Sequence, residues 1–140
     1  MTKLSLSDED RKEVVRYRLE KADRAYAEAV GSVGSGFVET SANRLYYAAY
    51  YAVSALLIAN GMQAKTHNGI IQLFGLHFIR TKVLDRRMGI VYNQLFSLRL
   101  TGDYEDRHRL SLSEDVVPLV KPARELIDAV STLARKQCGL

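Results

Sequence analysis

Three short clusters in this chain have residue types that can bind an anion or transfer a proton, and the first joins an arginine to tyrosines. In the segment NRLYYAAYYA, Tyr46 and Tyr50 are four residues apart, as are Tyr47 and Tyr51, so on a helix they form two adjacent columns. Arg44 precedes Tyr47 by three residues and joins its column. Two interpretations stay open. The tyrosines fill the edge of a core and hydrogen-bond through their hydroxyls, or Arg44 and Tyr47 stand at the mouth of a pocket for a phosphate or a base.

The second cluster, KTHNG, has the residues of an anion site at the start of a helix. Lys65 stands directly before the expected start, Thr66 has a hydroxyl that can cap it, and His67 falls in the first turn. The free N–H groups of a first helical turn attract anions, so these three residues are candidates for binding phosphate. His67 also shares a helical stripe with Ile70 and Phe74. A histidine that is simply packed and hydrogen-bonded is therefore the alternative.

The third cluster contains Arg99, Asp103, Tyr104 and His108. Arg99 follows Leu95 by four residues on an apolar stripe, and an arginine that faces the interior of a bundle must be paired. Asp103 is the nearest partner, so a structural bridge is one interpretation. The other is an arginine held for a ligand phosphate, with Tyr104 beside it. His108 stands between two arginines, whose charge should lower its pKa and keep it neutral, as a general base must be. An exposed loop histidine fits equally.

Other site types find little support in the sequence. The three histidines have no companion cysteines at metal-ligand spacing, no two of them are four residues apart, and no HExxH motif occurs. The one cysteine, Cys138, cannot form an internal disulfide. No motif of a nucleophilic serine is present. We therefore expect neither a metal nor a cofactor.

The elements that must position these clusters all read as helices. Ser7, followed by three acids, begins the first helix, and the glycines of residues 31–36 end it. The second runs from about Thr40 to Asn60 and stops at Gly61. It is apolar on nearly every side, which places it at the centre of a bundle or in a subunit interface.

Two helices follow in the middle of the chain. Thr66 caps one that continues through Ile79, and the next begins near Asp85. Gly102 is the expected end of this fourth helix.

The final helix is expected after a polar loop, with Ser111 or Ser113 as its cap. It contains Pro118 and Pro122, and both bend the chain unless the helix begins near Val117. Together these patterns predict an all-α fold, a mostly antiparallel bundle of four to five helices.

Composition and charge narrow the class of protein. The chain has 140 residues, of which 47% are hydrophobic and 26% charged, so we expect one soluble domain over residues 1–140. The net charge is +4, and residues 65–109 contain eight Lys/Arg against four Asp/Glu. This local excess is either the footprint of an anionic ligand or chance scatter. No apolar stretch is long enough to cross a membrane and the N-terminus is no signal peptide, so we expect a cytoplasmic protein.

In the order and spacing of three motifs, the chain resembles the HEPN domain superfamily, in particular its small stand-alone prokaryotic members. The motifs are NRLYYAAYYA with Ala55-Leu56-Leu57 and Gly61, KTHNGII with Phe74 and His77-Phe78, and Leu98-Arg99 with Asp103-Tyr104. The resemblance covers about residues 10–135. It implies a helical bundle that forms a homodimer, binding of nucleotide or RNA, and a minimal nucleotidyltransferase as the partner in a two-gene module of toxin–antitoxin type.

The resemblance also raises the question of ribonuclease activity. Many members are metal-independent ribonucleases that use an arginine and a histidine separated by four to six residues, and here no arginine stands at that spacing before any histidine. We favour a non-catalytic nucleotide- or RNA-binding module, whose binding residues are Arg44, Tyr47, Lys65, Thr66, His67 and Tyr104. The alternative is a divergent ribonuclease whose catalytic candidates are Arg99, Asp103 and His108, with Arg99 stabilising the pentacovalent phosphate and His108 or His67 as base. A helical protein-interaction domain without ligand is the third hypothesis.

Overall fold

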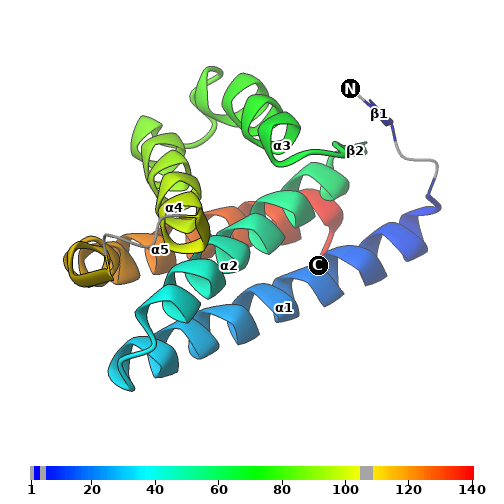
Figure 1. Cartoon of the computed structure of the whole chain (residues 1–140). Coiled ribbons are helices and arrows are strands. Elements are labelled where there is room, and N and C mark those ends of the chain that lie inside the picture. The colour runs from blue at the N-terminus through cyan, green and yellow to red at the C-terminus, as the bar shows by residue number, and fades with distance from the viewer. Residues whose placement is uncertain (1, 4–5, 105–108) are drawn as a thin grey trace.

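The computed structural model describes the backbone of residues 2–3, 6–104 and 109–140 and the side chains of residues 6–100 and 113–140. Within these ranges the chain folds into five α-helices, which confirms the predicted all-α bundle. They are α1 (Asp8–Gly34), α2 (Val38–Ala59), α3 (His67–Phe74), α4 (Arg86–Tyr104) and α5 (Arg109–Cys138), and a π-helical segment, η1 (Gly75–Ile79), continues α3. Figure 1 shows α1 and α2 running antiparallel, with α5 behind them and α3 and α4 on one side.

Helix α2 is the centre of the bundle. It contacts α1, α3, α4 and α5, and every side chain from Ala52 to Ala59 is buried. The small side chains of Ala48, Ala49 and Ala52 have no exposed surface, so neighbouring helices approach closely there. The central position predicted from the all-round apolar surface of this helix is confirmed, and helices of the same chain cover it.

Helix α1 begins and ends where the sequence predicts. The Ser7 hydroxyl accepts a hydrogen bond of 3.1 Å from the Asp10 N–H and caps the first turn. The expected end within residues 31–36 is confirmed, because the helix includes Gly31 and ends at Gly34. Glycine costs only about 1 kcal/mol inside a helix, and the packing of Val33 against a small apolar cluster offsets that cost.

The start of α3 and the start of α4 are both confirmed. The Thr66 hydroxyl accepts a hydrogen bond of 2.9 Å from the Gly69 N–H, and an Asp85 carboxylate oxygen accepts one of 2.8 Å from the Arg87 N–H. The third helix reaches Ile79 as expected, but its last five residues form a π-helix rather than an α-helix. Hydrophobic periodicity does not separate these two forms over so short a segment.

The two helix ends that flank the predicted polar loop differ from expectation. Helix α4 continues through Gly102 to Tyr104, so that glycine does not end it. Helix α5 begins at Arg109, before either of the serines predicted to cap it, Ser111 and Ser113. A single glycine and an early polar turn are both tolerated when the rest of the helix is well packed.

Both prolines of α5 lie inside the helix. Because neither Pro118 nor Pro122 has an N–H, each leaves a carbonyl of the preceding turn without its helical partner. The early part of α5 turns away from the direction of its remainder in Figure 1, as the sequence predicts for a helix that starts well before Val117.

A pair of very short strands was not predicted. Strand β1 (Thr2–Lys3) pairs antiparallel with β2 (Met62–Gln63), which lies between α2 and α3. Pairs of two residues carry no detectable alternation in sequence, so no pattern reveals them. The pairing brings the described N-terminal residues close to the start of α3.

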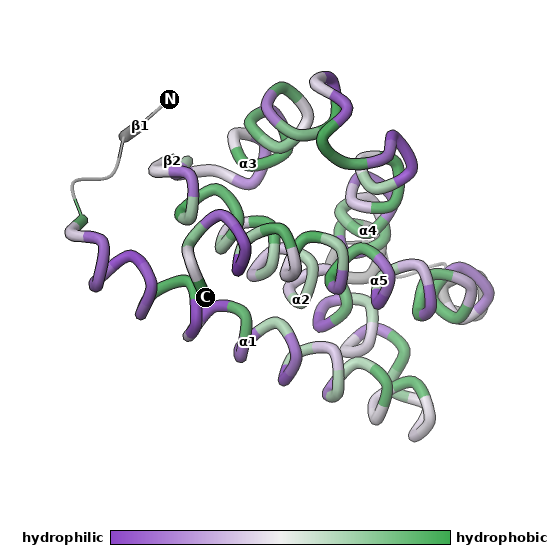
Figure 2. Tube along the Cα trace, turned by 180° about the vertical axis from the view of Figure 1, so that it is seen from behind, coloured by the Kyte–Doolittle hydropathy of each residue, from purple (hydrophilic) through white to green (hydrophobic). Residues whose placement is uncertain are grey.

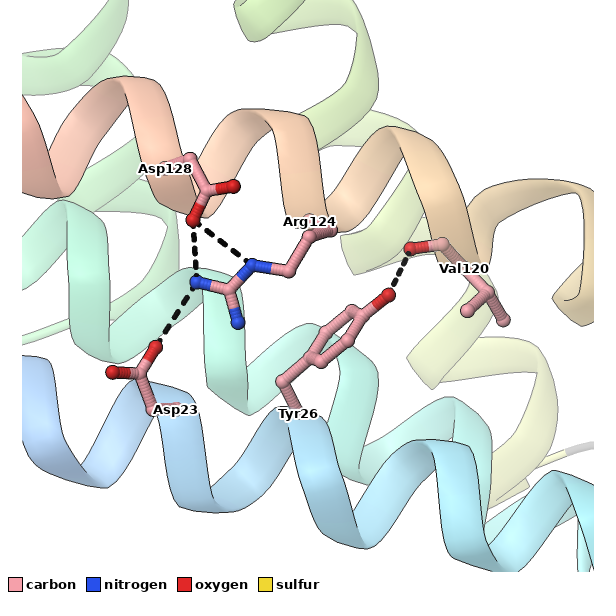
Figure 3. A network of polar contacts seen from close by, with 5 residues as sticks. All are labelled: Asp23, Tyr26, Val120, Arg124 and Asp128. Atoms are coloured by element: carbon pink, nitrogen blue, oxygen red, sulfur yellow. Dashed lines mark hydrogen bonds and ion pairs between the residues drawn. The ribbon is translucent and has the colours of Figure 1, made fainter.

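A polar network joins α1 to α5 (Figure 3). The guanidinium of Arg124 contacts Asp23 of α1 at 3.0 Å and Asp128 of its own helix at 2.7 Å, and it lies 4.9 Å from the ring centre of Tyr26. The Tyr26 hydroxyl donates a hydrogen bond of 2.9 Å to the Val120 carbonyl. Burial raises the pKa of that hydroxyl, so it keeps its proton for this bond.

Hydrophilic and hydrophobic residues separate clearly along the chain. Figure 2 shows many hydrophilic positions along the first half of α1, whereas α2 is mostly hydrophobic. Nowhere in the described ranges does a helix combine the length and the apolar character that a membrane span requires.

Candidate functional site

The candidate site is built around a contact between α2 and the first residue of α3. Tyr46 has no exposed surface, and its hydroxyl oxygen lies 2.7 Å from Nδ1 of His67, which is half-buried. Thr66 fixes the backbone at this point by capping α3. Gly69 is also required, because a Cβ there would lie 2.9 Å from the Cβ of Ala64.

Aromatic rings enclose the imidazole of His67. The ring centres of Tyr50 and Tyr47 lie 5.1 Å and 5.9 Å from it, and Phe96 of α4 stacks on it at 6.2 Å. We name Tyr46, Tyr47, Tyr50, His67 and Phe96 the tyrosine–histidine cluster. Its members come from α2, α3 and α4, so the cluster forms only in the folded bundle.

Two arginines lie against the same tyrosine. The guanidinium carbon of Arg99 lies 5.4 Å from the ring centre of Tyr47 and 5.6 Å from that of Tyr46, and Arg99 is half-buried, as its stripe predicts. The guanidinium carbon of Arg44 lies 5.3 Å from the ring centre of Tyr47. Arginine packed on an aromatic ring directs its N–H groups outward in the plane of the guanidinium, a geometry that can match phosphate oxygens.

Arg44 is also tied to its own surroundings. Its guanidinium donates to the Asn43 side-chain oxygen at 2.9 Å and forms an ion pair of 3.7 Å with Glu28 of α1. Arg44 therefore has a structural role, whatever it binds.

The surroundings of the cluster shift the pKa values of His67, of Tyr46 and of the neighbouring Tyr92. Burial, and then the charge of Arg99, lower the pKa of His67, so its imidazole is neutral at pH 7. Burial is the main cause that raises the pKa of Tyr46 to about 12, and burial also raises the pKa of Tyr92. With raised pKa values, the hydroxyls of Tyr46 and Tyr92 are protonated at neutral pH.

These protonation states assign the direction of the hydrogen bond. In the described part of the chain, the Tyr46 hydroxyl has one acceptor within hydrogen-bond distance, Nδ1 of His67, while the buried Tyr92 hydroxyl makes no hydrogen bond. Tyr46 therefore donates to Nδ1, and the proton of the neutral imidazole is on Nε2. In this tautomer His67 offers a donor and has no free lone pair.

The structure brings some of the predicted site residues together and separates others. Arg44, Tyr47, His67 and Arg99 meet at the tyrosine–histidine cluster. Thr66 serves as the cap of α3. Lys65 is exposed and makes no ion pair with a described residue.

Three predicted residues lie outside the described side chains. Asp103 and Tyr104 belong to the last turn of α4, where only the backbone is described, and His108 lies between the described ranges. No group of His, Cys, Asp and Glu suited to a metal ion occurs among the described residues.

Sequence reasoning missed the contacts that Tyr46, Tyr50 and Phe96 make with His67. The repeat of tyrosines at four-residue spacing was a usable signal, because it places Tyr46 and Tyr50 in one column. Phe96 stands three residues before Arg99 and so shares its side of α4. The convergence of the three segments had no signal in the sequence.

Comparison with known proteins gives a consistent result. The HEPN domain family matches residues 15–133. A UPF0332 protein of Thermotoga maritima is 29% identical over 124 residues, which cover 89% of this chain and 93% of that protein. The protein named "Putative toxin MJ0142" of Methanocaldococcus jannaschii is 31% identical over 87 residues, 62% of this chain and 59% of its own. A second protein of that organism, named "Putative toxin MJ0605", is 26% identical over 71% of this chain and 75% of its own.

Proposed function

The chain belongs to the HEPN domain family, and from that premise we propose that it is a nucleotide- or RNA-binding module that acts as the toxin-like half of a toxin–antitoxin pair. The names of two relatives support the toxin-like role. The resemblance of the sequence motifs supports a minimal nucleotidyltransferase as the partner and a homodimer as the assembly.

The observation that carries the binding role is the contact between Tyr46 and Nδ1 of His67, from which we assign the tautomer of His67. With Tyr46 donating to Nδ1, the imidazole presents Nε2–H as a donor, beside the guanidinium of Arg99. Two donors and the half-buried ring of Tyr47 match the chemistry of a nucleotide, in which phosphate oxygens accept hydrogen bonds and a base stacks. A lone pair that could take a proton from a ribose hydroxyl is occupied.

Binding is tested by titrating the purified protein with labelled single-stranded RNA and with a nucleoside triphosphate at several salt concentrations. We expect affinity to fall as salt rises, because binding releases cations from the nucleic acid and added salt makes that release less favourable. Affinity that is absent at low salt for both probes would leave the third hypothesis, a protein-interaction domain.

A divergent ribonuclease is the second candidate, and one observation favours it. His67 is neutral at pH 7 and close enough to Arg99 for that charge to lower its pKa, so a base and a phosphate-binding cation are neighbours. Catalysis would require the hydrogen bond with Tyr46 to reverse. Incubation of total RNA with the protein in EDTA separates the two functions, since cleavage without metal supports the ribonuclease and intact RNA supports the binding module.

A further inference from the structure

A cavity of about 690 Å³ lies where η1 leads into α4, away from the tyrosine–histidine cluster. Ile79 and Leu84 form an apolar part of its wall, and Arg80, Lys82 and Arg86 contribute cationic side chains. Its volume lies in the range of small-molecule sites. In Figure 2, hydrophilic segments flank a short hydrophobic stretch in this connection between α3 and α4.

The three cations of this cavity have no partners among the described residues. Arg80, Lys82 and Arg86 are exposed, and none forms an ion pair or a side-chain hydrogen bond with a described group. Elsewhere in the described ranges most arginines are engaged, including the adjacent Arg87, which lies 3.2 Å from Glu125.

One carboxylate also lines the cavity, and it is hydrogen-bonded to a backbone N–H. An oxygen of Asp85 accepts the N–H of Arg87 at 2.8 Å. Three cations against one anion leave the lining with a formal charge of +2. The cavity therefore attracts anions.

The conformation of Lys82 adds a second observation. Its φ of +63° makes it the one residue other than glycine with positive φ in the described backbone. Its N–H donates to the Ile79 carbonyl at 3.0 Å in the turn that follows the π-helical segment, and glycine is the usual residue at positive φ. A lysine here is conformationally less favourable than glycine, so its charge is the property that distinguishes it.

We propose that the cavity formed by η1 and the start of α4 is a phosphate-binding site, with Arg80, Lys82 and Arg86 as its cations. None of the residues that line it is aromatic, so it has no ring on which a base can stack. The site therefore recognises phosphate groups without reading a base, whether they belong to an oligophosphate or to the backbone of an RNA strand. It is separate from the nucleotide site proposed above and does not depend on it.

The test compares two variants that each remove three positive charges. The first, Arg80→Gln with Lys82→Gly and Arg86→Gln, empties the cavity of cations, and glycine at position 82 fits the positive φ. The control, Arg24→Gln with Lys121→Gln and Lys136→Gln, removes three exposed cations from α1 and α5. Circular dichroism confirms that both remain folded. The probes are inorganic tripolyphosphate and a short single-stranded RNA.

We expect tripolyphosphate to bind the wild type and the control alike and to bind the cavity variant at least about tenfold more weakly. If RNA also uses the cavity, the slope of log affinity against log salt falls by about 2 in the cavity variant, about 0.7 for each lost contact. RNA binding that is unchanged in that variant identifies an oligophosphate as the ligand. The proposal is overturned if both variants bind the probes equally weakly. It is also overturned if the wild type and the cavity variant bind each probe with the same affinity, or if the wild type binds neither probe. Loss of RNA binding in Arg99→Ala leaves it unaffected.

Discussion

The hydroxyl of Tyr46 lies 2.7 Å from Nδ1 of His67, and this one contact joins the buried centre of the bundle to the first turn of α3. The two residues are 21 positions apart in the chain. Through this bond a core residue fixes the orientation and the tautomer of a half-buried imidazole.

Tyr46→Phe removes that bond while keeping the ring. Because the lost partner leaves a nitrogen acceptor poorly satisfied, we expect the free energy of unfolding to fall by about 0.5–1.5 kcal/mol. Urea denaturation measures it. Tyr50→Phe is the matched control, since its hydroxyl has no hydrogen bond to a described residue, and it should change stability little. Equal effects of the two substitutions would contradict the assignment.

The lowered pKa of His67 predicts how stability changes with pH. Above pH 6.5 the imidazole is neutral in both the folded and the unfolded chain, so it contributes no pH dependence. Below pH 6.5 the unfolded state binds a proton that the folded state resists, so stability falls until the pH passes the folded pKa. Denaturation of wild type and His67→Asn across this range isolates the effect. A wild type that gains stability relative to the variant on acidification would show that the sign is wrong.

Replacement of Arg99 distinguishes a ligand-binding role of this arginine from a structural one. As a ligand arginine, its replacement by alanine should leave the melting temperature nearly unchanged and weaken nucleotide or RNA binding by about 1.5–3 kcal/mol. As the partner of Asp103 in a buried pair, its loss would cost about 3–5 kcal/mol of stability. We expect the first result. A large loss of stability in Arg99→Ala, restored by adding Asp103→Ala with binding intact, would show that Arg99 is structural.

The network of Figure 3 should stabilise the contact between α1 and α5. Arg124→Ala removes its contacts with Asp23 and Asp128, and we expect a loss of about 1 kcal/mol because both carboxylates are largely exposed. Arg16→Ala, which breaks a pair within one turn of α1, is the control and should cost less than about 0.5 kcal/mol. Thermal unfolding of the two variants measures both losses. Equal losses would show that the Arg124 contacts stabilise the protein no more than an isolated surface ion pair does.

A homodimer remains a prediction. Helix α2, which suggested it, is covered within one chain, but Phe37, Ile90 and Val117 are about half exposed or more, at 62%, 47% and 57%. Light scattering at micromolar protein should give twice the chain mass of 15.8 kDa. A single species of 15.8 kDa would refute the dimer.

Most residues that cap or pack a helix were readable from sequence, except the caps predicted for α5, and the way the helices meet was not. Ser7 and Thr66 are caps because their hydroxyls satisfy N–H groups within three residues, which is a local property. The apolar surface of α2 similarly predicts burial without reference to a partner. The helix end predicted at Gly102 is wrong, because the cost of one helical glycine is small beside that of losing packed turns.

The residues of the candidate site likewise fall into those that the sequence identifies and those that only the fold identifies. Arg44, Tyr47, His67 and Arg99 were recognisable by type, and the structure brings them together. The roles of Tyr46 and Phe96 depend on how α2, α3 and α4 pack. Contacts between residues far apart in the chain leave no periodic signal in one sequence, so these roles required the fold.

The enclosure of α2 by its neighbours also governs how fast its amide protons exchange with solvent and which substitutions it tolerates. Amide protons of a helix covered on all sides exchange only when the whole bundle opens, so those of residues 52–59 should be the slowest in the molecule. Substitutions there are equally constrained, because Ala48, Ala49 and Ala52 have no exposed surface and any larger side chain must displace a neighbouring helix. Among relatives, α2 should therefore vary least in side-chain volume, while the exposed face of α1 is free to diverge.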